Sequence, residues 1–228
     1  MGRVWVIVPA AGSGARFGGR PKQYRDLGGR PVLWHVLTRL ACVPQMAGMA
    51  IGIAADDQDW PLLKDRPLGA YSYSGGATRA ETVLAGLASL THARPSDFVL
   101  VHDAARPCVA RSDIFKLCAA DLTQGALLAS PVADTLKEVQ AGRAIATLAR
   151  ERLWRALTPQ IFPLEVLRTA LTRALTAGIT ITDEASACEY QGLQPLLVAG
   201  RADNIKITWP EDLEIAEGIL RRLEAAGD

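Results

Sequence analysis

The chain has 228 residues, of which 49% are hydrophobic and 21% charged, and its formal net charge at pH 7 is +1. This composition is typical of a globular chain with a full hydrophobic core, and it excludes a disordered, collagenous or coiled-coil protein. The near-neutral charge also argues against a nucleic-acid partner, because proteins that bind nucleic acid usually carry a clearly basic domain or stripe.

The sequence shows no sign of a membrane span, a secretion signal or a zinc site. The apolar run near the start, residues 4–11, is shorter than the 18 or more residues of a spanning helix, and it contains Pro9. It has no small-x-small cleavage site before the polar stretch that follows. The four cysteines and three histidines are not at metal-ligand spacing. We therefore expect a cytoplasmic protein with free thiols and no membrane contact.

Strands and helices are predicted to alternate along most of the chain. Continuous β-branched runs bounded by Pro, Gly or Asp predict strands buried on both faces. Apolar residues at helical spacing predict the helices, and Thr78 with Glu81 forms a capping box at the start of one of them. The expected strands are residues 3–9, 49–54, 70–73, 98–102, 126–130, 195–198 and 204–208. The expected helices are residues 32–42, 57–64, 78–90, 112–122, 164–177, 183–190 and 210–223.

This alternation predicts the α/β class, with a mostly parallel Rossmann-like sheet and helices on both faces. Residues 131–153 interrupt the pattern, because the runs 132–139 and 144–148 flank a short polar turn that contains Gly142. Such a pattern is typical of a β-hairpin. We expect a single domain, residues 1–228, with this hairpin as an inserted arm at about 131–157 that is either a lid or a contact to another subunit.

A glycine-rich loop, residues 9–24, follows the first predicted strand. Its glycines allow backbone N–H groups to turn toward a ligand, and phosphates bind at such loops at the carboxyl edge of a parallel sheet. Arg16, Arg20 and Lys22 add positive charge. The dinucleotide motif Gly-x-Gly-x-x-Gly is incomplete because Phe17 replaces its third glycine, and the Gly-Lys pair of a Walker A loop is absent. The loop therefore predicts phosphate binding without identifying the ligand.

Seven short motifs, in chain order, resemble those of the 2-C-methyl-D-erythritol 4-phosphate cytidylyltransferases. These enzymes are nucleotidyltransferases that join a sugar or polyol phosphate to a nucleoside monophosphate. The motifs are residues 9–14 with Arg16 and 21–24, residues 75–76 with Arg79 and 83–87, residues 101–107, Pro131 with 134–135, residues 157–160, residues 182–185, and residues 200–201 with 204–206.

The resemblance implies a nucleotide-diphospho-sugar transferase-like fold and a reaction of non-mevalonate isoprenoid biosynthesis. A phosphate oxygen of the acceptor would attack the α-phosphorus of CTP, and pyrophosphate would leave. The resemblance also implies Mg²⁺ or another divalent cation, and a homodimer in which each arm reaches the partner's site. Two polyanions meet in this reaction, so the main task of the protein is charge neutralisation and in-line placement.

The resemblance assigns roles to particular residues. It implies catalysis by Arg16, Lys22 and Lys206. It implies nucleotide binding by Pro9, Ala10, Ala11, Gly12, Ser13, Gly14, Gly76, Arg79, Thr82, Asp103 and Ala104. It implies binding of the acceptor by Arg106, Thr135, Arg150, Thr158 and Asp203. Whether Arg150 or the neighbouring Arg152 or Arg155 binds the acceptor phosphate stays open.

Asp103 is also expected to bind the metal ion, because it follows the predicted strand 98–102 at the carboxyl edge of the sheet. His102 beside it is expected to be structural, since neighbouring residues of a strand point to opposite faces.

Three alternative functions stay open. A cytidylyltransferase for another polyol phosphate, such as ribitol 5-phosphate, would share the nucleotide loop, although residues 22–24 and 182–185 favour methylerythritol phosphate. A nucleotide-sensing binding module could use the same fold, but the intact basic residues favour an enzyme. An oxidoreductase is disfavoured by Phe17.

Overall fold

The computed structural model describes residues 2–12, 14, 17 and 21–228. Among these residues, seven strands form one sheet in the order β11-β7-β10-β6-β1-β4-β5. All neighbours in this sheet are parallel except that β10 runs antiparallel to both β6 and β7. The strands are β1 (Val4–Pro9), β4 (Met46–Ile53), β5 (Ala70–Ser74), β6 (Phe98–Val101), β7 (Ala126–Pro131), β10 (Trp154–Pro163) and β11 (Leu196–Ala199). The predicted α/β class with a mostly parallel sheet is confirmed.

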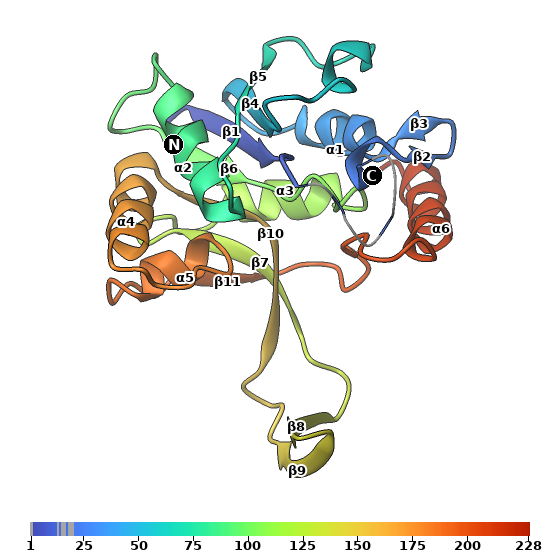
Figure 1. Ribbon diagram of the computed structural model, residues 1–228, viewed down its shortest axis with the longest axis vertical. Coiled ribbons are helices and arrows are strands. Elements are labelled where there is room, and N and C mark those ends of the chain that lie inside the picture. Colours follow the sequence, from blue (N-terminus) through green and yellow to red (C-terminus); the bar gives the residue numbers. More distant parts are fainter. Residues whose placement is uncertain (1, 13, 15–16, 18–20) are drawn as a thin grey trace.

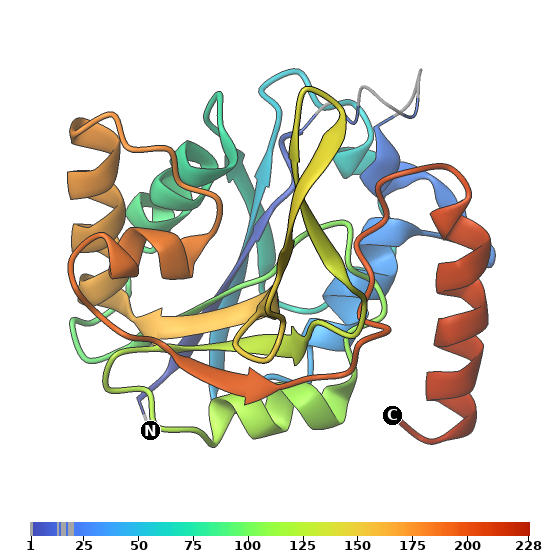
Figure 2. The same ribbon diagram turned by 90° about the horizontal axis from the view of Figure 1, so that it is seen from below.

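Helices cover both faces of the sheet, and the side chains of β1 alternate between the two resulting cores. Val4, Val6 and Val8 face α1 (Val32–Leu40) and α3 (Arg111–Cys118). Trp5 and Ile7 face the other core, with the helices α2 (Arg79–Ser89), α4 (Leu164–Thr176) and α5 (Glu184–Glu189). Helix α6 (Asp212–Ala225) packs on a third, smaller cluster, on the side of the molecule opposite α4 (Figure 2). Every helix within the described residues is too short or too polar to span a bilayer.

The predicted hairpin arm is present and projects away from the sheet (Figure 1). Its tip is the antiparallel pair β8 (Leu136–Gln140) and β9 (Arg143–Leu148). The two turn residues, Ala141 and Gly142, both have positive φ angles, 48° and 76°. Two successive positive φ angles are those of a tight type I′ turn, whose twist matches that of the two strands.

Strand β10 is the main element missing from the sequence-based prediction. The prediction ended the arm at about residue 157 and assigned no strand there, but the return limb of the arm continues into the sheet as far as Pro163. The smaller paired strands β2 (Asp26–Leu27) and β3 (Arg30–Pro31) were also not predicted. Strand β10 separates β6 from β7 in the sheet and so joins the arm directly to the edge where the predicted site lies.

Three predicted elements differ in the structure. Residues 57–64 form only a short turn, η3 (Trp60–Leu62), because the Asp57 side chain accepts hydrogen bonds from the backbone of Asp59 and Trp60 and closes a local turn. Residues 204–208 form no strand. Helix α3 begins at Arg111 and ends at Cys118, whereas the predicted helix spanned residues 112–122.

Candidate active site

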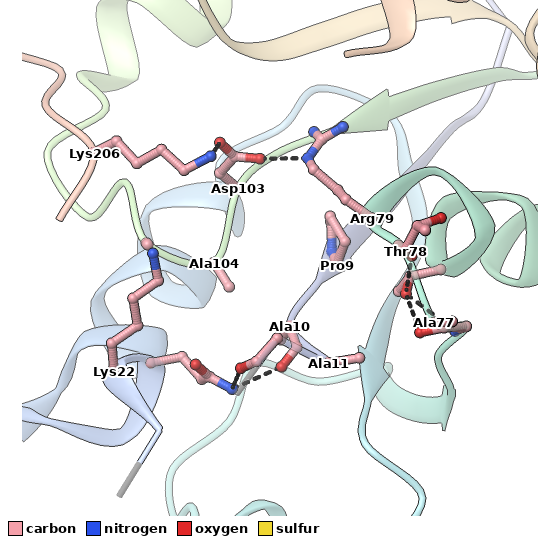
Figure 3. Close-up of a pocket in the computed structure, with 15 residues that line it drawn as sticks. Pro9, Ala10, Ala11, Lys22, Ala77, Thr78, Arg79, Asp103, Ala104 and Lys206 are labelled. Carbon is pink, nitrogen blue, oxygen red and sulfur yellow. Dashed lines mark hydrogen bonds and ion pairs between the residues drawn. The ribbon is translucent and has the colours of Figure 1, made fainter. Parts of the chain in front are cut away.

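Two clefts adjoin one another at the carboxyl ends of β1 and β6. The first, here named the loop cleft, has an open volume of about 640 Å³. Its lining residues are Pro9, Ala10, Ala11, Gly12, Lys22, Gln23, Gly76, Ala77, Thr78, Arg79, Thr82, Asp103, Ala104, Ala105 and Lys206 (Figure 3). The second, named the β10 cleft, has a volume of about 510 Å³. Its lining residues are Arg79, Asp103, Arg106, Ala156, Leu157, Thr158, Gln160, Thr182, Asp183 and Lys206.

Within the part of the chain that the structure describes, three side chains line both clefts, those of Arg79, Asp103 and Lys206. The loop cleft therefore brings together most of the predicted nucleotide-binding residues with Lys22 and Lys206. The β10 cleft contains Arg106 and Thr158 from the predicted acceptor-binding set.

The glycine-rich loop is anchored by a short turn, η2 (Lys22–Tyr24), that follows it. The buried side chain of Gln23 donates hydrogen bonds to the carbonyl oxygens of Ala10, at 2.7 Å, and Gly12, at 3.2 Å. Lys22 reaches into the loop cleft, and its Nζ donates to the Ile207 carbonyl at 3.0 Å. Sequence reasoning did not assign Gln23 a role, although its place in the motif 21–24 was a signal that could have found it.

The turn at residues 75–76 packs closely against the glycine-rich loop. A Cβ atom at Gly75 would lie 2.5 Å from the Cβ of Ala11, so only glycine permits this approach. The Thr82 hydroxyl accepts a hydrogen bond from the Gly76 N–H at 3.1 Å and donates one to the Thr78 carbonyl at 2.9 Å. Thr82 is only 2% exposed, and it holds the turn in place where it borders the loop cleft.

Asp103 follows β6 and forms ion pairs with three basic side chains. Its Oδ1 lies 2.8 Å from Arg79 Nε, and its Oδ2 lies 2.8 Å from Lys206 Nζ (Figure 3). Oδ2 also lies 3.6 Å from Arg106 Nε. Burial by itself raises the pKa of Asp103, but the three cations outweigh it and hold the pKa well below its usual range. Asp103 is therefore an anion at neutral pH in a predominantly positive site.

Arg79 pairs with a second carboxylate, that of Glu184. Arg79 Nη1 lies 2.7 Å from Glu184 Oε1, and Nη2 lies 3.1 Å from Oε2. Burial alone would lower the pKa of Arg79, but Glu184 and Asp103 raise it, so the guanidinium stays charged. Glu184 belongs to the motif 182–185, but sequence reasoning assigned it no role in the site.

His102 supports the site from inside the core. Its Nε2 donates to the Arg106 carbonyl at 2.9 Å, which leaves Nδ1 as the acceptor for the Thr158 hydroxyl at 3.0 Å. The same hydroxyl accepts from the Asp103 N–H at 3.0 Å. Burial lowers the pKa of His102 to about 4, so the ring is neutral at pH 7. These hydrogen bonds agree with a structural role for His102. They also occupy the hydroxyl of Thr158, which therefore supports the fold although Thr158 borders the β10 cleft.

Some predicted site residues lie elsewhere. Thr135 and Arg150 are exposed on the arm and line neither cleft, and Arg150 donates a hydrogen bond to the Ala133 carbonyl. Asp203 pairs with Arg201 at 2.6 Å outside both clefts. Gly14 has a φ angle of +62° and turns the loop, but it does not line the loop cleft. The predicted residues Ser13 and Arg16 lie outside the described residues.

Asp103 is the residue best suited to a divalent cation. Among residues 2–12, 14, 17 and 21–228, no group of three or more His, Cys, Asp and Glu side chains could hold a metal ion. Mg²⁺ does not require such a group, because it commonly binds one or two carboxylates together with water and substrate phosphates. Both oxygens of Asp103 are paired with cations, and the side chain of Lys206, which pairs with Oδ2, is 43% exposed. The donor set thus fits an ion that arrives with a polyphosphate.

The glycine-rich loop, the lysines around the cleft and the ionised Asp103 fit an enzyme of the nucleotidyltransferase class, which handles two phosphorylated substrates. The family model for 2-C-methyl-D-erythritol 4-phosphate cytidylyltransferase matches residues 4–222. The chain belongs to this family, as the identity to curated relatives also shows. The relative from Halorhodospira halophila is 48% identical over 235 residues, which covers 99% of this chain and 97% of the relative. The relative from Xanthomonas oryzae is 49% identical and covers 100% of this chain and 86% of the relative.

Solved structures of enzymes with the same name agree with this assignment. The crystal structure from Francisella tularensis is 33% identical and superposes with a TM-score of 0.81, covering 95% of this chain and 99% of that one. The crystal structure from Thermus thermophilus is 32% identical with a TM-score of 0.80, covering 96% and 99%.

Proposed function

We propose that the chain transfers CMP from CTP to 2-C-methyl-D-erythritol 4-phosphate. The products are 4-diphosphocytidyl-2-C-methyl-D-erythritol and pyrophosphate, in the formation of non-mevalonate isoprenoid precursors. Membership of the cytidylyltransferase family supports the reaction. The observation that carries the assignment of the site is the meeting of two clefts at Arg79, Asp103 and Lys206, because two substrates must approach one reacting phosphorus.

In this proposal the loop cleft binds CTP and the β10 cleft binds the acceptor. Backbone groups of residues 9–12 and the turn 75–76 surround the nucleotide, and Lys22 contacts the triphosphate. Arg106, whose Nη1 donates to the Asn204 carbonyl at 2.7 Å, borders the acceptor's side of Asp103. Lys206 lies at the boundary between the two clefts, where the phosphate of the acceptor would meet the α-phosphate of CTP.

The chemistry needs no general base, because the phosphate of the acceptor is already an anion at neutral pH. A phosphate oxygen of the acceptor forms a bond to the α-phosphorus, and the bond from that phosphorus to the oxygen of the β-phosphate breaks as pyrophosphate leaves. Negative charge increases around the α-phosphorus in the transition state. Lys22 and Lys206 stabilise it, and each such contact typically contributes about 10² to 10³ in rate.

Asp103 would bind the divalent cation. The ion would neutralise charge on the phosphates when bound. Lys206 can leave Oδ2 of Asp103 and turn toward the substrates, since its side chain is partly exposed.

We also propose that the enzyme is a homodimer held together by the arms. The ribbon of β8 and β9 exposes Val139, Ile145 and Leu148, with exposed fractions of 60%, 55% and 42%. A two-stranded ribbon is marginally stable alone, and clustered exposed apolar side chains mark an interaction surface. The partner's arm would bring Thr135 and Arg150 to the β10 cleft. The four cysteines are free thiols, as expected in a reducing cytoplasm, where we place the reaction.

The proposal is tested by mixing the purified protein with CTP, Mg²⁺ and one acceptor at a time. We expect pyrophosphate release and the cytidyl diphosphate product with 2-C-methyl-D-erythritol 4-phosphate, and much slower release with ribitol 5-phosphate. If neither acceptor leads to pyrophosphate release, the proposed function is refuted. Faster turnover of ribitol 5-phosphate would reassign the substrate.

A further inference from the structure

Glu184 is a fully buried carboxylate next to the site, with an exposed fraction of 0%. It lines neither the loop cleft nor the β10 cleft. A buried carboxylate is costly unless it is paired, and here Arg79 supplies the pair with two hydrogen bonds. The two residues are 105 positions apart in the sequence, so the pair joins the first turn of α5 to the first turn of α2.

The position of Glu184 is fixed by its neighbours in the chain. Asp183 caps α5 by accepting a hydrogen bond from the Ser186 N–H at 2.9 Å. Gln160 on β10 donates to Asp183 Oδ2 at 2.8 Å and accepts from the Ala185 N–H at 2.9 Å. The start of α5 is therefore attached on both sides of Glu184 to the strand that borders the β10 cleft. Glu184 provides a rigid anion rather than a mobile one.

The guanidinium of Arg79 is held on two edges. Nη1 and Nη2 face Glu184, and Nε faces Asp103 at 2.8 Å. A bidentate pair fixes the plane of a guanidinium as well as its distance. Because that plane is fixed by Glu184, the Nε–H is aimed at Oδ1 of Asp103, and Oδ2 is left to face Lys206 and the substrates.

We infer that Glu184 is a positioning residue for the cytidylyl transfer, which acts by holding Arg79 against Asp103 at the junction of the two clefts. This inference rests on the proposed function. Glu184 also offsets the charge of Arg79, so that Arg79 braces Asp103 and does not turn toward the phosphates of CTP. Without Glu184, Arg79 is free to compete with Lys22 and Lys206 for those phosphates, and Asp103 loses its fixed orientation.

The test uses Glu184→Gln, which keeps the size of the side chain but removes its charge. Glu165→Gln is the matched control, because Glu165 pairs with Arg168 at 2.6 Å on the exposed surface of α4. We expect kcat to fall by about 10- to 100-fold in Glu184→Gln, as for other residues that orient a ligating side chain. The change in KM for CTP should be smaller, since Glu184 touches neither cleft. The control should keep the wild-type values.

A double-mutant cycle separates this role from a purely structural one. If Glu184 acts through Arg79, then adding Glu184→Gln to Arg79→Gln should cause no further loss of kcat. Equal losses in both backgrounds would mean that Glu184 acts independently of Arg79, and would overturn the inference. If Glu184→Gln does not fold, Glu184→Asp replaces it, because Asp keeps the charge but is one methylene too short for both hydrogen bonds.

A second readout does not depend on activity. The Arg79 Nε–H resonance, assigned by its absence in Arg79→Gln, should exchange slowly with water in the wild type and quickly in Glu184→Gln. An unchanged resonance or an unchanged kcat in Glu184→Gln would overturn the inference. If the wild type itself releases no pyrophosphate, the proposed function fails, and this resonance still decides whether Glu184 holds Arg79.

Discussion

Asp103→Asn tests the charge arrangement of the site most sharply. The amide keeps the size of the side chain, and its oxygen can still accept a hydrogen bond from Arg79. It removes the one anion that Lys206 and Arg106 share with Arg79. The three cations then repel one another in a buried site, and the candidate ligand of the divalent cation is lost. The variant should therefore lose both stability and activity.

The structure allows the loss of stability to be estimated. Removing one partner of a buried ion pair typically costs about 3–5 kcal/mol. The lower value applies here, because Arg79 keeps Glu184 and the side chain of Lys206 is 43% exposed. For a chain of this size each kcal/mol lowers Tm by about 2–4 °C, so a loss of about 3 kcal/mol lowers Tm by roughly 6–12 °C.

The difference in stability between the wild type and Asp103→Asn should depend on pH, and the direction of this dependence follows from the pKa of Asp103. The folded-state pKa of Asp103 lies below its unfolded value of about 3.9, so the carboxylate stabilises the fold above that pH. The stabilisation is lost as the pH falls and Asp103 becomes protonated in the folded state. The gap in Tm between wild type and Asp103→Asn should therefore be full at pH 7 and should close in strong acid.

Thermal unfolding at pH 7 and turnover of CTP with Mg²⁺ are the two assays. Turnover should fall by about 10² to 10³. Asp65→Asn is the control, because Asp65 pairs with Arg30 at 3.0 Å on the surface, where an ion pair contributes little. An Asp103→Asn variant that matches the control in both Tm and turnover would refute the account of the site.

Three further changes are predicted. Lys22→Ala should lower kcat by about 10²- to 10³-fold with little change in Tm. The control Lys64→Ala changes an exposed lysine and should retain wild-type kinetics. Equal turnover of the two variants would remove Lys22 from the mechanism. The wild type should lose stability between pH 6.5 and about 4, by at most about 1.4 kcal/mol per pH unit, because the unfolded chain protonates His102 before the folded one does. Denaturant titrations of His102→Gln should show a smaller slope over this range, and an identical slope would contradict the buried neutral ring. Ile145→Glu on the arm should give a monomer in sedimentation experiments and a loss of turnover; a stable dimer would exclude the arm as the interface.

The elements predicted correctly are those with local signals. The buried run of β1 and the capping box of Thr78 and Glu81 each lie within a few neighbouring residues, and both are present. Strand β10 has no such signal. It passes from exposed residues at the base of the arm to fully buried ones in the sheet, and Pro159 in its middle normally argues against a central strand. Its position between β6 and β7 depends on tertiary contacts alone.

The site was predictable where one segment contains the signal. Residues 9–12 of the glycine-rich loop line one cleft together with Lys22 and Asp103, whereas Gly14 does not, and their binding roles stay predictions. Arg79 and Glu184 are 105 residues apart in the sequence, and no local sequence pattern predicts that they pair. The Thr82 hydroxyl, for which nucleotide binding stays a prediction, also holds the turn 75–76 through hydrogen bonds to backbone groups that no local pattern indicates.

The most direct test of the central claim is a crystal structure of the enzyme with CTP and Mg²⁺. The account predicts that the triphosphate lies in the loop cleft, that Lys22 has left the Ile207 carbonyl to contact a phosphate oxygen, and that the ion is bound to Asp103. A triphosphate bound outside this cleft, with Lys22 still on the Ile207 carbonyl, would contradict it.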